Sequence, residues 1–248
     1  MSGPLQIPGL PFEPIAQMAP RRTLRPVMRQ TWRDLTFLHW PLEAALVQPF
    51  IPNGLHLDLY DGVAWVGLVP FVIDDLTLPK APAVPWLSSF AETNVRTYVI
   101  DRNGLRGVWF FSLDAARLPA VIGARAAYAL PYFWSRMKVS CDGQTAQYSS
   151  VRRFSALGRC DIEVEIGDAI AQPSELEIFL TARFRLYAHR GKRILKADVE
   201  HPPWKLKRAT VVKLDQDLLQ AAGLPAVRSQ PLAHFGGRVD VLVGACTI

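Results

Sequence analysis

The sequence predicts an α+β protein dominated by an antiparallel sheet or barrel, with a few peripheral helices. Two observations support this class. Roughly ten segments have the alternation or the β-branched composition of strands, whereas few have helical spacing, and this balance is typical of antiparallel architectures. Hydrophobic residues make up 50% of the 248 residues. That share is enough for a sizeable core and excludes disorder for most of the chain.

The first part of the chain predicts an arm, a short helix and a hairpin. Residues 1–30 are rich in proline and lack periodicity, so we expect an extended or partly disordered arm, followed by a single domain over residues 31–248. Pro41 lies near the start of a short helix. Segments 56–60 and 63–72 form a hairpin, and the second segment is apolar on both faces, as in a central strand covered on both sides.

The later elements follow from the same signals. Segment 76–89 contains several prolines and is expected to be a long loop that covers a pocket mouth. Further strands are expected at 138–140, 145–154, 159–166, 184–189, 192–199 and 239–243. Helices are expected from 118 to about 129, from the capping box that begins at Ser174, and from 215 to 223.

The candidate site is a strand-like run in which polar residues alternate with Thr and Val. Its polar residues are Glu92, Asn94, Arg96 and Tyr98. A strand has a side-chain period of two, so these four side chains share one face. A carboxylate, an amide, a guanidinium and a phenol on one face can orient a small polar ligand.

A hairpin turn at Asn103-Gly104 brings aromatic residues to this run. If the turn has two residues, Trp109 and Phe111 lie on the polar face, which then suits the wall of a pocket. A loop of odd length moves the other series there instead, namely Val108, Phe110, Ser112 and Asp114. A half-exposed strand with a surface Glu92–Arg96 ion pair explains the same alternation without a site.

Several classes of site lack support in the sequence. The three cysteines and five histidines are scattered without metal-ligand spacing, so we expect no metal site and no cofactor. Free thiols suit a reducing cytoplasm. The N-terminus lacks a secretory pattern, and no apolar stretch is long enough for a transmembrane helix, so no membrane partner is expected. The basic segment 21–33 lacks any nucleic-acid-binding motif, and no nucleic acid is expected as a partner.

Several motifs together resemble a known family. They are Trp65 to Phe71 after Asp58-x-x-Asp61-Gly62, Glu92 to Val99 followed by Phe110 to Ala115, Leu130-Pro131-Tyr132-Phe133, and His201-x-Pro203-Trp204. In this order they resemble the bacterial YqjF-like family, the domain of unknown function 2071, across most of the chain. That family distantly resembles acetoacetate decarboxylase. The resemblance implies that residues 31–248 form a single closed antiparallel β-barrel with an internal cavity.

The resemblance also limits the chemistry. Acetoacetate decarboxylase forms a Schiff base on a lysine, and the matching segment here, Pro131-Tyr132-Phe133-Trp134, has none. We expect the nearest lysine, Lys138, to be exposed. Two functions stay open: an enzyme acting on a small carbonyl- or carboxylate-bearing substrate, or a non-catalytic barrel that binds a small metabolite. In the enzyme, Glu92 and Arg96 are catalytic as acid or base and as anion clamp.

The expected ligand-binding residues are Asn94, Tyr98, Trp109, Phe111 and Tyr132. Tyr132 either donates a hydrogen bond into the cavity or packs with its hydroxyl satisfied. The expected partner is a small-molecule ligand, and a homo-oligomer is left open. A buried Glu92 with a raised pKa and access to a cavity favours the enzyme, whereas full pairing with Arg96 favours the binding protein.

Overall fold

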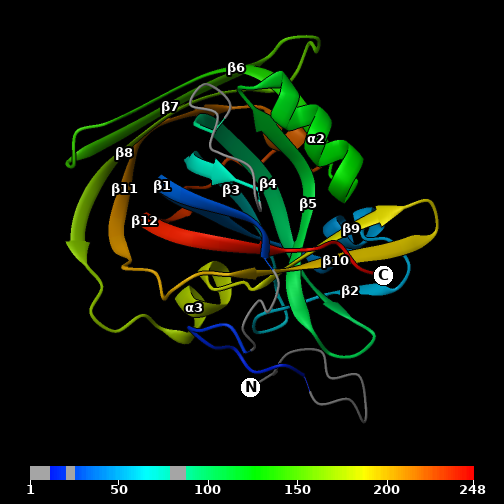
Figure 1. Ribbon diagram of the computed structural model, residues 1–248. Coiled ribbons are helices and arrows are strands. Elements are labelled where there is room, and N and C mark those ends of the chain that lie inside the picture. Colours follow the sequence, from blue (N-terminus) through cyan, green and yellow to red (C-terminus); the bar gives the residue numbers. More distant parts are fainter. Residues whose placement is uncertain (1–11, 21–25, 79–87) are drawn as a thin grey trace.

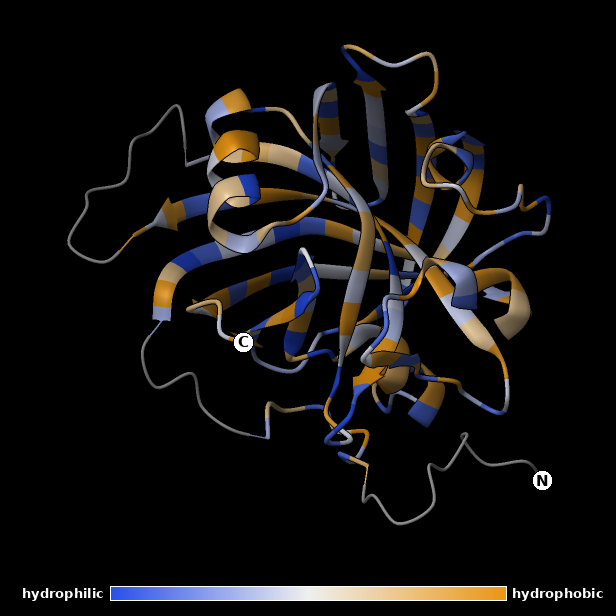
Figure 2. Cartoon of the chain, turned by 90° about the vertical axis from the view of Figure 1, so that its right-hand side faces the viewer, coloured by the Kyte–Doolittle hydropathy of each residue, from blue (hydrophilic) through white to orange (hydrophobic). Residues whose placement is uncertain are grey.

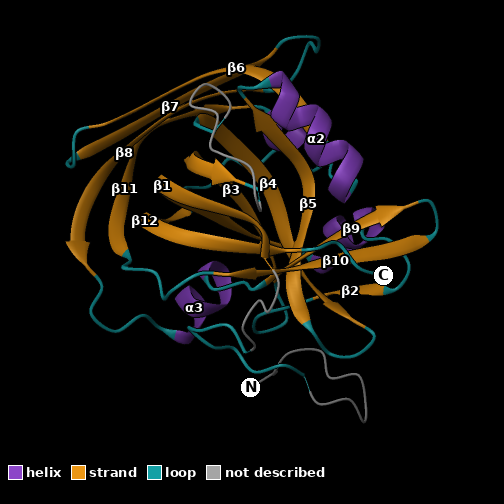
Figure 3. Ribbon diagram, viewed as in Figure 1, coloured by secondary structure: helices purple, strands orange, loops and turns teal. Residues whose placement is uncertain are grey.

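The computed structural model describes residues 12–20, 26–78 and 88–248 (Figure 1). Within them the strands are β1 (Pro26–Leu42), β2 (Leu55–Leu57), β3 (Ala64–Thr77), β4 (Phe90–Asp101), β5 (Arg106–Ala115), β6 (Tyr132–Cys141), β7 (Thr145–Arg152), β8 (Arg159–Ala169), β9 (Arg185–Arg190), β10 (Arg193–Glu200), β11 (Lys207–Gln216) and β12 (Leu232–Gly244). The helices are α1 (Ala44–Val47), the 3-10 helix η1 (Gln48–Phe50), α2 (Leu118–Tyr128), α3 (Glu175–Thr181) and α4 (Leu218–Ala221) (Figure 3).

In the described residues, all 12 strands belong to one sheet, and this sheet closes on itself through branches at β5 and β12. β5 pairs with β9 near Val108 and with β6 near Leu113. β12 pairs with β11 near Phe235 and with β10 near Val243. The five strands β12-β1-β3-β4-β5 therefore form a wall that belongs to two rings of strands. β9 and β10 close the first ring. β6, β7, β8 and β11 close the second ring.

The shared wall explains why β4 is buried along its whole length. One of its faces looks into the ring closed by β9 and β10. Its other face packs in a second core, where Leu38, Leu68 and Val95 are fully buried. The half-exposed surface strand is thereby excluded for β4. The prediction of a buried central strand at 63–72 is confirmed, because nearly every residue of β3 from Val66 to Ile73 is buried.

The outer strands show the expected alternation. Hydrophilic and hydrophobic residues alternate along them (Figure 2), and in β7 buried positions alternate strictly with exposed ones. This is typical of antiparallel strands that cover a core with one face and meet solvent with the other. α2 lies beside β5 at one end of the sheet, and α3 lies near the opposite end (Figure 1).

Four predictions about elements are wrong. The segments 56–60 and 63–72 do not form a hairpin, because β2 pairs with β4 and not with β3. β1 was missed, and it runs through Pro41, so α1 begins only at Ala44. β11 was missed as well, and the helix expected at 215–223 is the shorter α4, because residues up to Gln216 continue the sheet. β6 begins at Tyr132, well before the expected 138. In each case pairing with neighbouring strands outweighs the local signal.

Part of the N-terminal arm packs against the domain. The Arg106 backbone N–H donates to Glu13 Oε2 (2.9 Å), and Arg185 forms an ion pair with the same oxygen (3.0 Å). Residues 1–11 and 21–25 of the predicted arm, and residues 79–87 of the predicted loop, lie outside the described residues. In the described ranges, no helix combines the length and the apolar character needed to cross a membrane.

Candidate functional site

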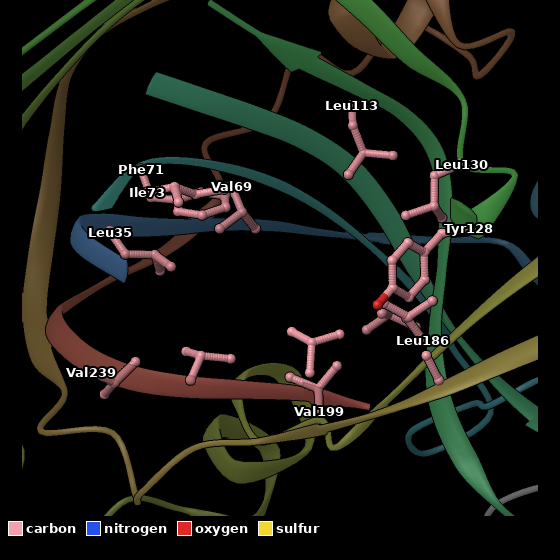
Figure 4. Close-up of a cluster of buried hydrophobic side chains, with 14 of the residues drawn as sticks. Leu35, Val69, Phe71, Ile73, Leu113, Tyr128, Leu130, Leu186, Val199 and Val239 are labelled. Atoms are coloured by element: carbon pink, nitrogen blue, oxygen red, sulfur yellow. The ribbon is translucent and has the colours of Figure 1, made fainter. Parts of the chain in front are cut away.

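A cavity of about 530 Å³ lies within the ring closed by β9 and β10. Its size is in the range of pockets that enclose drug-sized ligands. Figure 4 shows Leu35, Val69, Leu113 and Val199 pointing from different strands toward the same interior space. α2 contributes a further wall. The walls are thus largely apolar, and the few polar groups that reach the cavity define what it can recognise.

β4 supplies three of the polar groups. Glu92, Asn94 and Arg96 all line the cavity and are nearly fully buried. The Oδ1 atom of Asn94 has no hydrogen-bond partner among the described residues. Tyr98 shares their face but does not line the cavity. It lies beneath the cavity floor, where its hydroxyl contacts His39 Nε2 (2.6 Å) and donates to the Leu180 carbonyl (2.5 Å).

Glu92 is a buried carboxyl group with one hydrogen bond. The Tyr132 hydroxyl donates to Glu92 Oε2 (2.8 Å). Burial raises the pKa of Glu92 to about 8, the Tyr132 hydrogen bond lowers it, and the charge of Asp114 raises it. Desolvation outweighs the hydrogen bond, because an ionised carboxylate in this apolar site loses most of its hydration. Glu92 therefore holds a proton at neutral pH that can be transferred inside the cavity.

Arg96 does not pair with Glu92, contrary to the expectation of a Glu92–Arg96 pair. Its Nη2 atom donates to the Leu180 carbonyl (3.2 Å), and its guanidinium lies over the rings of Phe37 and Tyr98 (5.4 and 5.7 Å). Within the described part of the chain, the Nε atom of Arg96 has no hydrogen-bond partner. Among the described residues, no carboxylate lies within ion-pairing distance of this guanidinium.

A second guanidinium at this end was not predicted. Arg183 lines the cavity and lies over the Tyr98 ring at 4.5 Å. Its Nη1 atom donates to Asp58 Oδ2 (2.6 Å), and Asp58 Oδ1 accepts from Arg106. The Nη2 atom of Arg183 has no hydrogen-bond partner in the described ranges. No local pattern marks this residue, because Asp58 and Arg183 are 125 positions apart in the chain.

The expected placement of Trp109 and Phe111 is wrong. Asp101 N donates to Leu105 O, so the hairpin loop has three residues, and Phe110 lies opposite Arg96. A register shift at Phe111 then restores the expected pairing of Asn94 with Leu113. As a result Trp109 and Phe111 pack in the second core, on the far face of the wall.

The alternative prediction, a hairpin loop of odd length that places Val108, Phe110, Ser112 and Asp114 on the polar face, is correct only for the residues near the turn. Val108 and Phe110 line the cavity, as that alternative expects. Ser112 and Asp114 do not line it, because they come after the register shift. Asp114 instead accepts two hydrogen bonds from Arg152 (2.8 and 2.9 Å) in a buried ion pair. A one-residue bulge therefore decides which residues of β5 face the cavity: Val108 and Phe110 before it and Leu113 after it.

Aromatic rings complete the cavity. Trp32 stacks on Trp204 (6.3 Å between ring centroids), and His201 lies 5.1 Å from Trp204. Burial lowers the pKa of His201 to about 4, so its ring is neutral at physiological pH. Its Nδ1 atom contacts the Pro202 carbonyl at 2.8 Å. A neutral ring engaged with the backbone supports a packing role for His201.

The donor set does not suit a Schiff base or a metal. Among the described residues that line the cavity there is no lysine, and Lys138 is exposed on β6, as expected. In the described ranges, no group of three or more histidine, cysteine, aspartate or glutamate side chains could hold a metal ion. The three cysteines are free thiols.

Comparison with known proteins identifies relatives in sequence. The family model DUF2071, described as an uncharacterized conserved protein, matches residues 29–240. The uncharacterized protein YqjF of Bacillus subtilis (strain 168) is 35% identical over 218 residues, which span 87% of this chain and 90% of that protein.

Comparison of structures identifies the fold. Acetoacetate decarboxylase from Legionella pneumophila superposes with a TM-score of 0.67 at 13% identity, covering 92% of this chain and 90% of the other. An acetoacetate decarboxylase-like enzyme from Sphingomonas wittichii RW1 gives 0.62 at 12%, covering 93% and 96%. The enduracididine biosynthesis enzyme MppR complexed with pyruvate gives 0.62 at 10%, covering 90% and 91%. The predicted α+β, acetoacetate decarboxylase-like fold is confirmed.

Proposed function

The chain belongs to the DUF2071 family, and from that premise we propose that it is an enzyme that transfers protons on a small carbonyl- or carboxylate-bearing molecule, without a Schiff base. The observation that carries the proposal is the Glu92 carboxyl group. It is buried, its pKa is raised to about 8, and it reaches an apolar cavity. A carboxyl group tuned to this range suits general acid–base catalysis near neutral pH.

The reaction class follows from the groups around the cavity. In its ionised form Glu92 takes a proton from the carbon next to a carbonyl group. The electron pair of that C–H bond moves onto the carbonyl oxygen to give an enolate, and return of the proton to carbon regenerates both partners. Tyr132, which donates to Glu92, stabilises the ionised form of the base. Arg96 and Arg183, with unpartnered N–H groups, hold an anionic group of the same molecule.

The absence of a lining lysine, in the described part of the cavity, separates this chemistry from that of the decarboxylase. A lysine amine would form an imine that accepts the electrons of a breaking C–C bond. Here the electrons move onto a carbonyl oxygen. The proposal is therefore restricted to proton transfer next to a carbonyl group.

Deuterium exchange tests the proposal directly. The first probe is 5-oxohexanoate, because its carbonyl group is several carbons away from its carboxylate, as the separation of Glu92 and Arg96 on β4 requires. Pyruvate, with which MppR has been solved, is the second probe. In D2O near pH 8, the wild-type protein should accelerate loss of the proton NMR signal next to the carbonyl of at least one probe. Glu92→Gln should reduce this rate to the buffer background. Glu165→Gln, at an exposed position of β8, should catalyse exchange of the probe's proton at the wild-type rate.

A non-catalytic barrel that binds a small metabolite is the second candidate. One observation favours it: in the described part of the cavity, Glu92 is the one lining carboxyl group, and the neutral His201 is engaged with the backbone. A second carboxyl or imidazole group free for proton transfer is therefore missing from the described lining. Binding of the keto acids by calorimetry without any exchange would establish this function and rule out the enzyme. Exchange that persists in Glu92→Gln would rule out Glu92 as the base.

A further inference from the structure

The polar groups of the cavity are separated into two ends. Glu92 and Arg96 lie four residues apart on β4, so their Cα atoms are about 13 Å apart at the usual rise of a strand. Glu92 is tied to Tyr132 at one end. The guanidinium of Arg96 extends the other way, toward Leu180 and Tyr98. The cavity therefore has a carboxyl end and a cationic end.

The cationic end has an excess of positive charge. Arg96 is 8% exposed and its Nε has no partner, and Arg183 is 7% exposed with an unpartnered Nη2. Both guanidiniums lie within 6 Å of the Tyr98 ring centroid. Asp58 is shared between Arg183 and Arg106, which leaves Arg96 without a carboxylate among the described residues. A buried, unpaired guanidinium favours an anionic ligand that can accept its N–H groups.

Apart from the Asn94 amide on β4, the space between the two ends is largely apolar. On β4, Asn94 is flanked directly by Val69 of β3 and Leu113 of β5. Across the cavity, α2 presents small residues: Ala120, Gly123, Ala124 and Ala127, called here the α2 wall. A Cβ atom added at Gly123 would meet nothing within 4 Å. Gly123 and Ala127 are exposed as well as lining the cavity, so a larger side chain at Gly123 has room to extend over the open part of the cavity.

We infer that the ligand is a linear organic acid, whose carboxylate binds Arg96 and Arg183 and whose apolar body of several carbons runs along β4 and the α2 wall. This inference rests on the proposed function, which places the reacting carbonyl group at Glu92. The reacting carbonyl is therefore several carbons away from the carboxylate. Because Gly123 has no side chain, it determines how long and how wide the ligand's apolar carbon chain can be.

Calorimetric titration of straight-chain acids tests the inference without requiring any reaction. The probes are butanoate, hexanoate, octanoate and decanoate at pH 7. Affinity for the wild-type protein should rise about three- to fourfold for each added methylene until the chain fills the cavity. Gly123→Leu should keep the affinity for butanoate and lose the gain from the longer acids. Ala126→Leu, at an exposed position of α2 outside the lining, should behave like wild type.

The role of the cationic end is tested separately with Arg96→Met. This variant should bind octanoate at least tenfold more weakly than wild type, whereas both proteins bind 1-octanol equally. Failure of every acid to bind, affinity independent of chain length, or equal effects of Gly123→Leu and Ala126→Leu would each overturn the inference. Loss of the deuterium exchange alone would overturn the proposed enzyme and leave the chain-length dependence of binding intact.

Discussion

The Tyr132 hydroxyl at the start of β6 donates a 2.8 Å hydrogen bond to Glu92 Oε2 in the middle of the sheet. This bond is the only one that the structure gives the Glu92 side chain in the described residues. It favours the ionised carboxylate, and burial disfavours it more strongly. The balance between these two effects makes Glu92 a group that titrates near neutral pH, and several expected outcomes follow from it.

The wild-type protein should lose stability relative to Glu92→Gln as the pH rises from about 4.5 to about 8. The pKa of Glu92 is about 8 in the folded state and has its ordinary value near 4.5 in the unfolded state. Between these values the unfolded state has released the proton and the folded state still holds it, so rising pH favours unfolding. The loss amounts to about 3–5 kcal/mol in total. Glu92→Gln should remove it, as measured by urea unfolding from pH 4 to pH 9.

Exposed Glu165 provides the control for this titration. Glu165→Gln should keep the wild-type dependence of unfolding free energy on pH. If Glu92→Gln and wild type lose stability in parallel between pH 5 and pH 8, Glu92 is ionised in the folded state and the acid–base role is excluded.

Tyr132→Phe should raise the pKa of Glu92 further. The phenol hydrogen bond stabilises the carboxylate, and its removal leaves desolvation unopposed. The measurement is a carbon-13 NMR titration of the glutamate carboxyl groups. Tyr128→Phe is the matched control, because Tyr128 also lines the cavity but donates to the Gly244 carbonyl (3.1 Å). A pKa that falls or stays constant in Tyr132→Phe would contradict the assignment.

Asp58→Asn should destabilise the protein by about 3–5 kcal/mol, because it leaves the guanidiniums of Arg106 and Arg183 buried without a counter-charge. Asp161→Asn provides the contrast. Asp161 pairs with Lys213 at 2.6 Å on the surface, where both side chains are about half exposed, and its loss should cost under about 1 kcal/mol. Chemical denaturation measures both. Similar small losses would show that water reaches the Asp58 network.

Arg96→Met should change stability by no more than about 1 kcal/mol, or increase it. No described carboxylate pairs with Arg96, and an apolar side chain of similar length replaces a buried charge without leaving a counter-ion unpaired. Thermal unfolding of the variant measures this. A loss similar to that of Asp58→Asn would mean that Arg96 holds the fold together and is not kept for a ligand.

Borohydride should trap no lysine adduct when the protein is incubated with pyruvate. The described lining contains no lysine, and Lys138 is exposed on β6. Peptide mass spectrometry after reduction checks the outcome. An adduct on any lysine that disappears when 5-oxohexanoate is added in excess would indicate imine chemistry in the cavity and contradict the proposed mechanism.

Much of the wall that carries the site could be predicted from the sequence. The alternation of Glu92, Asn94 and Arg96 placed these side chains on one face, and the apolar run at 63–72 predicted the neighbouring buried strand. β1 and β11 could not be predicted in this way. β1 is bent where Asp34 has a positive φ of 49°, and its register with β3 shifts between Arg33 and Leu38. Such a strand lacks a continuous period of two.

The sequence by itself determined which residues of β4 point the same way, because side-chain direction in a strand depends only on local backbone geometry. The tertiary structure decided everything that depends on distant partners. The three-residue loop after Asp101 turned Trp109 and Phe111 away from the cavity, and the pairing of β5 with β9 brought Arg183 toward Arg96. Burial on both sides raised the pKa of Glu92, since desolvation depends on every element that surrounds a group.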